Sequence, residues 1–246
     1  MLDKILIFFI FAQSPRFFVN PSRIEKFCRK DKTYTEVFVV EIKDFPAHIE
    51  IYVEDFFINE YGAAEFKKPG SYNFSLSPFI NITPRSFDME PNEKKEVRVS
   101  FTLPDTMKSY EKWCMLVFRC YPKKEKIPFI QLVGEIGVPI YVLLPEGNIK
   151  NADLIEMGKD GEKIYFSLKN FSPIHLRTNG KIFLINENNE KVFEKNFLNE
   201  VIMPFQKRKY LFDVPKNVKK GKYHFFAEVD YGGGEILKGE KELILP

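Results

Sequence analysis

KEVRVSFTL, residues 95–103, alternates polar and apolar side chains along its whole length. The apolar positions all have the same parity: Val97, Val99, Phe101 and Leu103. Successive side chains of an extended strand point to opposite faces, so these four would share one face. A typical turn sequence, Pro91-Asn92-Glu93, comes shortly before the stretch. The pattern therefore predicts a β-strand with one face in a core and the other in solvent.

Comparable short runs recur along the chain, separated by turn sequences. In the first half they span residues 36–43, 48–56, 72–78, 95–103, 113–121 and 129–144. In the second half they span residues 152–157, 163–169, 180–186, 191–197, 209–214, 222–231 and 235–245. No stretch keeps a helical period with caps at both ends. Short strands at regular intervals are typical of a β-sandwich or barrel.

Length and composition support an all-β protein of two domains. A chain of 246 residues is long enough for two domains of about 100–125 residues each. Aromatic residues make up 15% of the chain, including 26 Phe, and aromatic side chains favour strands. The turn sequence at 145–148, PEGN, separates the halves, so we predict domains at 15–146 and 147–246. The strand spacing in each is that of an immunoglobulin-like sandwich, and Tyr223 is a candidate tyrosine corner.

The amino terminus, MLDKILIFFIFAQS at residues 1–14, has the order of a secretory signal peptide. Lys4 precedes an apolar run, and small or polar residues follow it. The run is too short to span a bilayer, which needs about 20 apolar residues. Asp3 and Pro15 are untypical of such a signal, and the alternative is a buried first strand. We expect an exported, periplasmic protein.

The three cysteines do not define a disulfide. Cys114 and Cys120 fall in one predicted strand, which places them about 20 Å apart at about 3.3 Å per residue. They are therefore too far apart to bridge each other. A bond from Cys28 to either one stays open, but three buried thiols are the simpler expectation.

The sequence contains few of the residues and motifs that enzyme active sites use. It contains no G-x-S-x-G, H-E-x-x-H, C-x-x-C or phosphate-loop motif, and its three histidines are dispersed. Gly232-Gly233-Gly234 lies between two predicted strands and indicates a hairpin turn. A net charge of +3 does not call for a nucleic-acid partner. We expect a protein that is not an enzyme, with no metal or cofactor and no small-molecule substrate.

Three separated segments carry a resemblance. They are TPRSFDMEPNE at 83–93 leading into KEVRV, EKWCMLVFR at 111–119, and VDYGG at 229–233. In this order and spacing the chain resembles the PapD-like periplasmic pilus-assembly chaperones over about residues 18–246. The resemblance implies two immunoglobulin-like domains set in an L with a cleft between them. It also implies a non-enzymatic chaperone that binds subunits of a surface fibre by β-strand donation, with an outer-membrane usher as a further partner.

The resemblance assigns three residues to a buried interdomain salt bridge: Arg98, Glu111 and Asp230. In the family such a triad fixes the angle between the domains. The role here would be architectural, because an Arg can bind two carboxylates at once and join elements across the cleft.

The resemblance also implies a binding site in the cleft. Arg23 matches the family's first-strand Arg, which holds the carboxylate at the subunit's carboxyl terminus. The family's partner Lys on the last strand of the first domain is missing, since no basic residue occurs between Lys126 and Lys150. The strand-donating edge would carry Ile130, Leu132 and Ile136.

An alternative function needs no client subunit. The chain would then be a structural or adhesive two-domain module of an envelope assembly, without chaperone activity. In that case the apolar residues at 130, 132 and 136 would belong to the core of their own domain.

Overall fold

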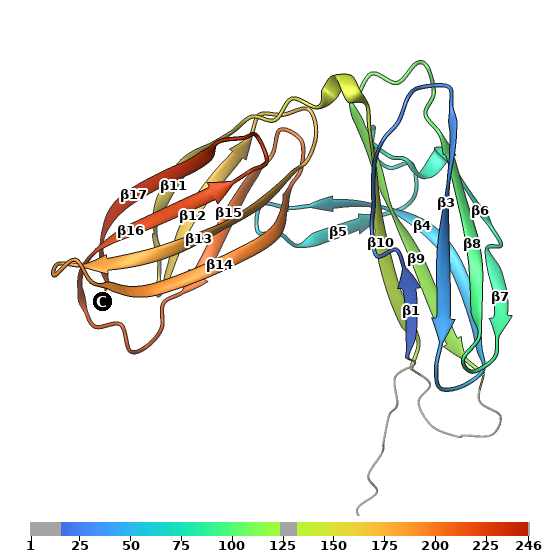
Figure 1. The fold of residues 1–246 in the computed structure, drawn as a ribbon, viewed down its shortest axis with the longest axis horizontal. Coiled ribbons are helices and arrows are strands. Elements are labelled where there is room, and N and C mark those ends of the chain that lie inside the picture. Colours follow the sequence, from blue (N-terminus) through green and yellow to red (C-terminus); the bar gives the residue numbers. More distant parts are fainter. Residues whose placement is uncertain (1–15, 124–131, 246) are drawn as a thin grey trace, which may run out of the picture.

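The computed structural model describes residues 16–123 and 132–245, which form two β-sandwiches (Figure 1). The expected signal segment at 1–14 and Ile130 lie outside the described residues. The described helices are the 3₁₀ turns η1 (Ser77–Phe79) and η2 (Pro145–Gly147). In the described part of the chain, no helix has the length and apolar character that crossing a membrane requires.

Two sheets form the first domain. One has the strand order β1 (Phe17–Asn20), β3 (Thr33–Ile42), β8 (Lys94–Thr102), β6 (Ile80–Thr83). The other has the order β2 (Ile24–Phe27), β10 (Gly134–Leu143), β9 (Glu111–Pro122), β4 (Ala47–Ile58), β5 (Ala64–Lys67). In addition β7 (Ser86–Met89) pairs with β4. The amino-terminal segment belongs to both sheets, because β1 pairs antiparallel with β3 while β2 pairs parallel with β10.

The core of the first domain confirms the alternation predicted for residues 95–103. Val97 and Val99 are fully buried and Phe101 is 1% exposed, whereas the Arg98 side chain is 68% exposed. The three apolar side chains pack against buried side chains of the opposite sheet. Leu116 and Phe118 belong to the same apolar cluster. The three cysteines are free and buried, as expected for small core side chains.

Two further sheets form the second domain. One has the strand order β11 (Ala152–Asp160), β12 (Lys163–Asn170), β15 (Lys207–Asp213). The other has the order β14 (Lys191–Ile202), β13 (Leu176–Asn186), β16 (Gly221–Asp230), β17 (Ile236–Leu245). Phe166, Leu184 and Phe225 are fully buried between them. The Tyr223 hydroxyl donates to the Lys219 carbonyl at 2.8 Å, which is the bond of a tyrosine corner. Residues 232–234 turn between β16 and β17, as predicted.

One predicted strand is wrong. Residues 72–78 form a turn that ends in η1, with a single bridge from Ser75 to Trp113. The cause is the fully buried Asp55 carboxylate, which accepts from the hydroxyls of Ser75 at 2.6 Å and Ser77 at 2.7 Å. These bonds hold the segment as a turn against β4. The short strands β1, β2, β5, β6 and β7 were not predicted, because each has only four residues.

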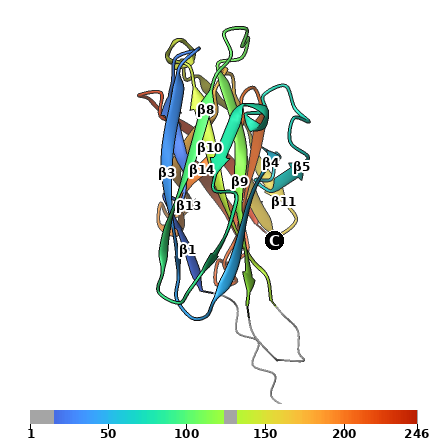
Figure 2. The same ribbon diagram turned by 90° about the vertical axis from the view of Figure 1, so that its right-hand side faces the viewer.

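The two sandwiches meet at an angle and share an apolar cluster. Figure 1 shows the L-shaped arrangement, and Figure 2 places the first domain in front. The first domain contributes Phe56, Trp113, Tyr141 and Leu143, and the second contributes Ile174, Val201 and Met203. All seven are at most 8% exposed. The domains are therefore joined by a small core of their own and not by the linker alone.

A hairpin strengthens this junction. The turn between β4 and β5 reaches the second domain, where the Lys209 amide of β15 donates to the Glu60 carbonyl at 2.7 Å. Gly62 in this turn has φ of +84°, and a Cβ there would lie 2.3 Å from an Arg208 nitrogen. The tip of the hairpin thus needs glycine for its backbone conformation, and it packs closely against the end of the Arg208 side chain.

Truncating the shared cluster should destabilise the whole molecule. Ile174 is 1% exposed, so Ile174→Ala should lower the free energy of unfolding by about 2–5 kcal/mol, through lost burial and a residual cavity. Urea denaturation followed by tryptophan fluorescence reports on this directly, because Trp113 lies in the same cluster. The matched control is Ile244→Ala on β17, since Ile244 is 71% exposed and should change stability by less than about 0.5 kcal/mol. Equal effects of the two variants would show that the domains do not share a core.

Candidate functional site

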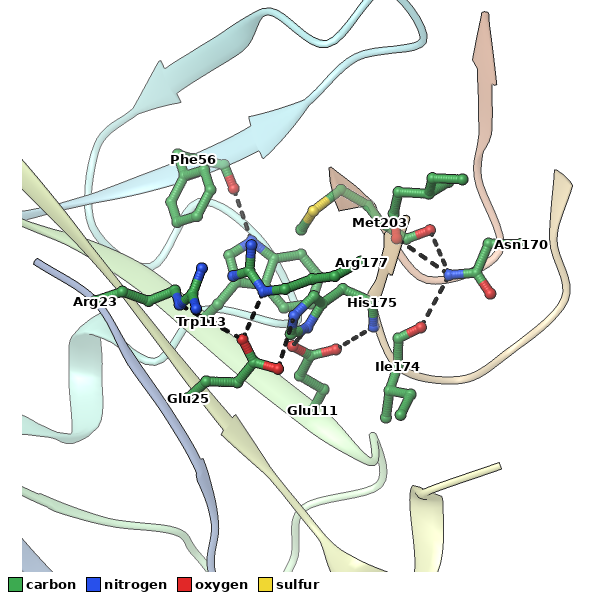
Figure 3. Close-up of polar contacts among 11 residues, drawn as sticks. Arg23, Glu25, Phe56, Glu111, Trp113, Asn170, Ile174, His175, Arg177 and Met203 are labelled. Carbon is green, nitrogen blue, oxygen red and sulfur yellow. Dashed lines mark hydrogen bonds and ion pairs between the residues drawn. The ribbon is translucent and has the colours of Figure 1, made fainter. Parts of the chain in front are cut away.

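A buried carboxylate joins the two domains. Glu111, the first residue of β9, is 1% exposed and accepts two bonds from His175 in the segment before β13. The His175 backbone amide donates to Oε2 at 2.6 Å, and Nδ1 of its imidazole lies 2.5 Å from Oε1. One carboxylate therefore fixes both the backbone and the side chain of a residue from the other domain (Figure 3).

The segment that carries His175 is itself held in place. The Asn170 side-chain amide donates to the carbonyls of Ile174 at 2.9 Å, and of Ile202 and Met203 at 3.1 Å each. The imidazole stacks on the Tyr141 ring of β10 with 4.2 Å between ring centroids. His175 therefore reaches Glu111 from a fixed position.

A second carboxylate lies beside this pair. Glu25 Oε2 of β2 accepts from Arg177 Nε at 2.7 Å and lies 3.8 Å from Arg23 Nε. Its other oxygen, Oε1, lies 3.5 Å from His175 Nε2. The Arg177 guanidinium also lies over the Tyr141 ring, at 5.4 Å. Cationic groups from both domains thus surround Glu25 at the junction (Figure 3).

The pKa values follow from these contacts. Burial alone would lower the pKa of His175, but the hydrogen bond with Glu111 and the nearby charges of Glu111 and Glu25 outweigh it and raise the pKa. Burial alone would raise the pKa of Glu25, but the hydrogen bond from Arg177 and the nearby charges of His175 and Arg177 lower it to about 2. The arrangement therefore favours an imidazolium between two carboxylates at neutral pH.

The predicted salt-bridge triad is wrong in two of its three members. Arg98 is on the exposed face of β8, where its side chain lies 3.8 Å from Glu96. The Asp230 carboxylate accepts from the Gly232 amide at 2.8 Å, which stabilises the turn after β16. Glu111 does join the domains, but through His175. The parity that buries Val97 and Val99 points Arg98 away from the junction.

The predicted carboxylate anchor, Arg23, lies at the junction, just before β2. Its side chain is 41% exposed and open to solvent. The Lys that the family places on the last strand has no counterpart on β10, but Arg177 from the second domain lies on the same carboxylate oxygen. The sequence alone did not point to Arg177, because β13 belongs to the other domain.

The strand-donating edge predicted at Leu132 and Ile136 is exposed at the first residue but not at the second. Leu132 is 37% exposed and its neighbour Val133 is 46% exposed, just before β10. Ile136 instead packs against the core of its own domain. Residues 140–143 of β10 pair with β2, whereas residues 134–139 pair with β9 only. Among residues 16–123 and 132–245, no strand covers the second edge of 134–139.

A Ser–His–Asp contact elsewhere is better explained by strand register. His48 of β4 lies 2.7 Å from Asp88 and 3.0 Å from the Ser86 hydroxyl, both on the neighbouring β7. The Asp88 side chain is 60% exposed and also pairs with Lys123. Asp88 faces His48 directly in the register, which brings polar side chains together on a solvent-exposed sheet face. Within the described residues, no group of three or more His, Cys, Asp or Glu could hold a metal ion.

Sequence reasoning missed His175, Arg177 and Glu25. The three histidines looked like dispersed structural residues, and nothing local distinguishes His175 from the others. Its importance follows from its contact with Glu111, which is 64 positions away in the chain. The only sequence signal was Glu111 itself, which the family resemblance placed at the interdomain bridge.

The stability of the molecule should depend on the titration of His175. The folded state raises its pKa, so this contribution is fully present below the unfolded pKa of about 6.5 and disappears as the pH rises through the folded value. We expect the stability advantage of the wild type over His175→Asn to shrink as the pH rises above about 6.5. Denaturant titrations at several pH values measure it.

The control for this prediction is His224→Asn. His224 is 45% exposed and pairs with Glu240 on the outer face of the second domain. Its variant should differ little from the wild type at any pH. A His175 advantage that stays constant or grows with pH would show that folding does not raise the pKa of the imidazole.

Comparisons with known proteins find similarity in structure and none in sequence. No family model matches the chain, and no curated protein matches it. A chain from the Salmonella enterica complex of the SafA pilin with the SafB chaperone matches with a TM-score of 0.52 and 14% identity, over 93% of this chain and 97% of that one. The class 5 fimbriae chaperone CfaA matches with a TM-score of 0.50 and 15% identity, over 92% of this chain and 99% of that one. The chain therefore has the two-domain all-β fold of the PapD-like pilus-assembly chaperones, as a divergent example.

Proposed function

We propose that this protein is an exported chaperone that binds subunits of a surface fibre by β-strand donation from residues 132–139. The observation that carries the proposal is the edge of β10, where residues 134–139 pair with β9 alone among the described strands. A strand with one free edge can pair with another chain, whose main-chain bonds then supply affinity.

The chemistry of this edge supports the proposal. Exposed apolar side chains at Leu132 and Val133 lead directly into it. By contrast β17, an edge strand of the second domain, carries Lys238, Glu240, Lys241 and Glu242. Charged side chains on an edge are a common protection against pairing with other chains. The free edge of β10 has fewer such features over residues 134–139, namely Glu135 and Pro139.

The pairing of β2 with β10 predicts in which direction a client strand would run and where it would end. Strand β2 runs parallel to β10 and begins at Ile24, opposite Ile140. A client strand that fills the free edge parallel to β10 would be collinear with β2 and would end at Arg23. Its terminal carboxylate would then meet the exposed guanidinium of Arg23. This supports Arg23 as the anchor, on a geometric ground independent of the resemblance.

Two solved structures of similar fold support the class of partner. One is a pilin–chaperone complex and the other is a fimbriae chaperone. Under the proposal, the clients are fibre subunits and an outer-membrane usher is a further partner. Export to the periplasm would follow from the same role.

The alternative, a structural or adhesive envelope module, has one observation in its favour. Ile136, which should project toward a client, packs against the core of its own domain. A module of this kind would not need the free edge of β10, and charging that edge would leave its function unchanged.

A single substitution separates these functions. Leu132→Glu should abolish capture of a client subunit, because it places a charge where an apolar strand must pair, while leaving the fold intact. The measurement is co-purification with candidate fibre subunits from the same organism, with circular dichroism as the check on folding. Ile244→Glu on β17 is the matched control and should leave capture unchanged. Full capture by the folded Leu132→Glu variant would exclude donation from this edge.

A further inference from the structure

The carboxylate of Glu25 is bound as a ligand would be. Its Oε2 lies between two guanidinium groups, at 2.7 Å from Arg177 Nε and 3.8 Å from Arg23 Nε. Its Oε1 lies 3.5 Å from His175 Nε2. Three cationic groups thus meet on a single carboxylate that comes from the same chain (Figure 3).

The His175 side chain points to the same place. It is 1% exposed, and its Nε2 makes no hydrogen bond in the described structure, although Nδ1 is bound to Glu111. A buried N–H without a partner is costly, so this position favours an acceptor closer than Glu25 Oε1 now lies. A carboxylate oxygen closer to Nε2 would give this N–H the partner that it lacks.

The net charge of the cluster favours binding of another anion. With His175 protonated, the cluster contains three positive groups, with Arg23 and Arg177, against the two carboxylates of Glu25 and Glu111. The cluster therefore has an excess of one positive charge. A carboxylate that replaced Glu25 would keep this balance, and one that joined it would neutralise the excess.

The two carboxylates differ in how easily they can leave. The Glu111 side chain is completely buried, whereas that of Glu25 is 36% exposed. Arg23 at 41% and Arg177 at 17% are also accessible from solvent. Glu111 is thus a permanent part of the junction, but Glu25 can rotate away into water on an edge strand. An outside carboxylate could take its place without unfolding anything.

We infer that Arg23, Arg177 and His175 form a carboxylate-binding site, and that Glu25 occupies it as an internal competitor until a carboxylate from outside displaces it. This deepens the proposed function and rests on it for the identity of the natural ligand, the carboxyl terminus of a client. The second domain supplies through Arg177 the cation that β10 lacks. A tethered competitor is present at an effective concentration of about millimolar or more, so it lowers the apparent affinity for free carboxylates.

The test removes the competitor. Glu25→Gln in the full chain should bind the peptide acetyl-Ala-Ala-Ala-Phe, with a free carboxylate, about tenfold or more tightly than the wild type does. The Nε–H signals of Arg23 and Arg177 in nuclear magnetic resonance spectra report binding at the site itself. The carboxamide form of the peptide should bind both proteins equally weakly. Glu25→Asp, which keeps the charge on a shorter side chain, should give an intermediate affinity.

Two further variants serve as controls for the site. Glu194→Gln, which removes an exposed glutamate paired with Lys191, should behave as the wild type. Adding Arg177→Gln to Glu25→Gln should cancel the gain. If the free carboxylate binds Glu25→Gln no better than the wild type, or no better than the carboxamide, the inference is wrong. Since this peptide test needs no client, its failure is distinct from the loss of capture that tests strand donation.

Discussion

The bond from Glu111 to His175 is the constraint on which the interdomain geometry depends. A fully buried carboxylate is unfavourable unless it is paired and hydrogen-bonded, and Glu111 satisfies this with a backbone amide and an imidazole from the other domain. Neither domain can bury its half of the pair alone. The shared apolar cluster around Ile174 and the hairpin contact at Glu60 then stabilise the same relative position. The angle between the sandwiches is thus fixed by side chains, and a flexible linker alone would not fix it.

The two halves of β10 have different roles because of this geometry. In its C-terminal half, Tyr141 and Leu143 belong to the interdomain cluster and β2 covers the edge. In its N-terminal half, residues 134–139 have β9 on one side and no described strand on the other. The change between them comes at Ile140, next to Arg23 and the cationic cluster. A rigid junction therefore ends at the point where a free edge begins, and this arrangement suits the binding of an added strand.

The sequence predicted what local patterns determine. Alternation in residues 95–103 predicted a half-buried strand, and the strand spacing predicted two sandwiches. It failed for residues 72–78, where apolar and aromatic side chains imitate a strand but bonds to Asp55 hold a turn. That failure has a physical reason, since the deciding partner lies 20 or more positions away in the chain.

The candidate site was predictable only in part, for the same reason. Glu111 and Arg23 were found through the resemblance to a family, whereas Arg177, His175 and Glu25 acquire their roles from contacts between domains. Arg177 and Glu25 are 152 positions apart, and no local pattern brings them together. Arg98 was misassigned because its motif position matched, although strand parity points it away from the junction.

Hydrogen exchange of a client complex tests the central claim most directly. The protein would be studied free and in complex with a fibre subunit that it captures, with exchange at backbone amides followed by mass spectrometry. If the client adds a strand to β10, the segment 134–138 should exchange more slowly in the complex, because the amides of Glu135 and Gly137, which point away from β9, become hydrogen-bonded. The edge of β17 should be unchanged. Unchanged exchange at 134–138 in a stable complex, with new protection elsewhere, would contradict strand donation from β10.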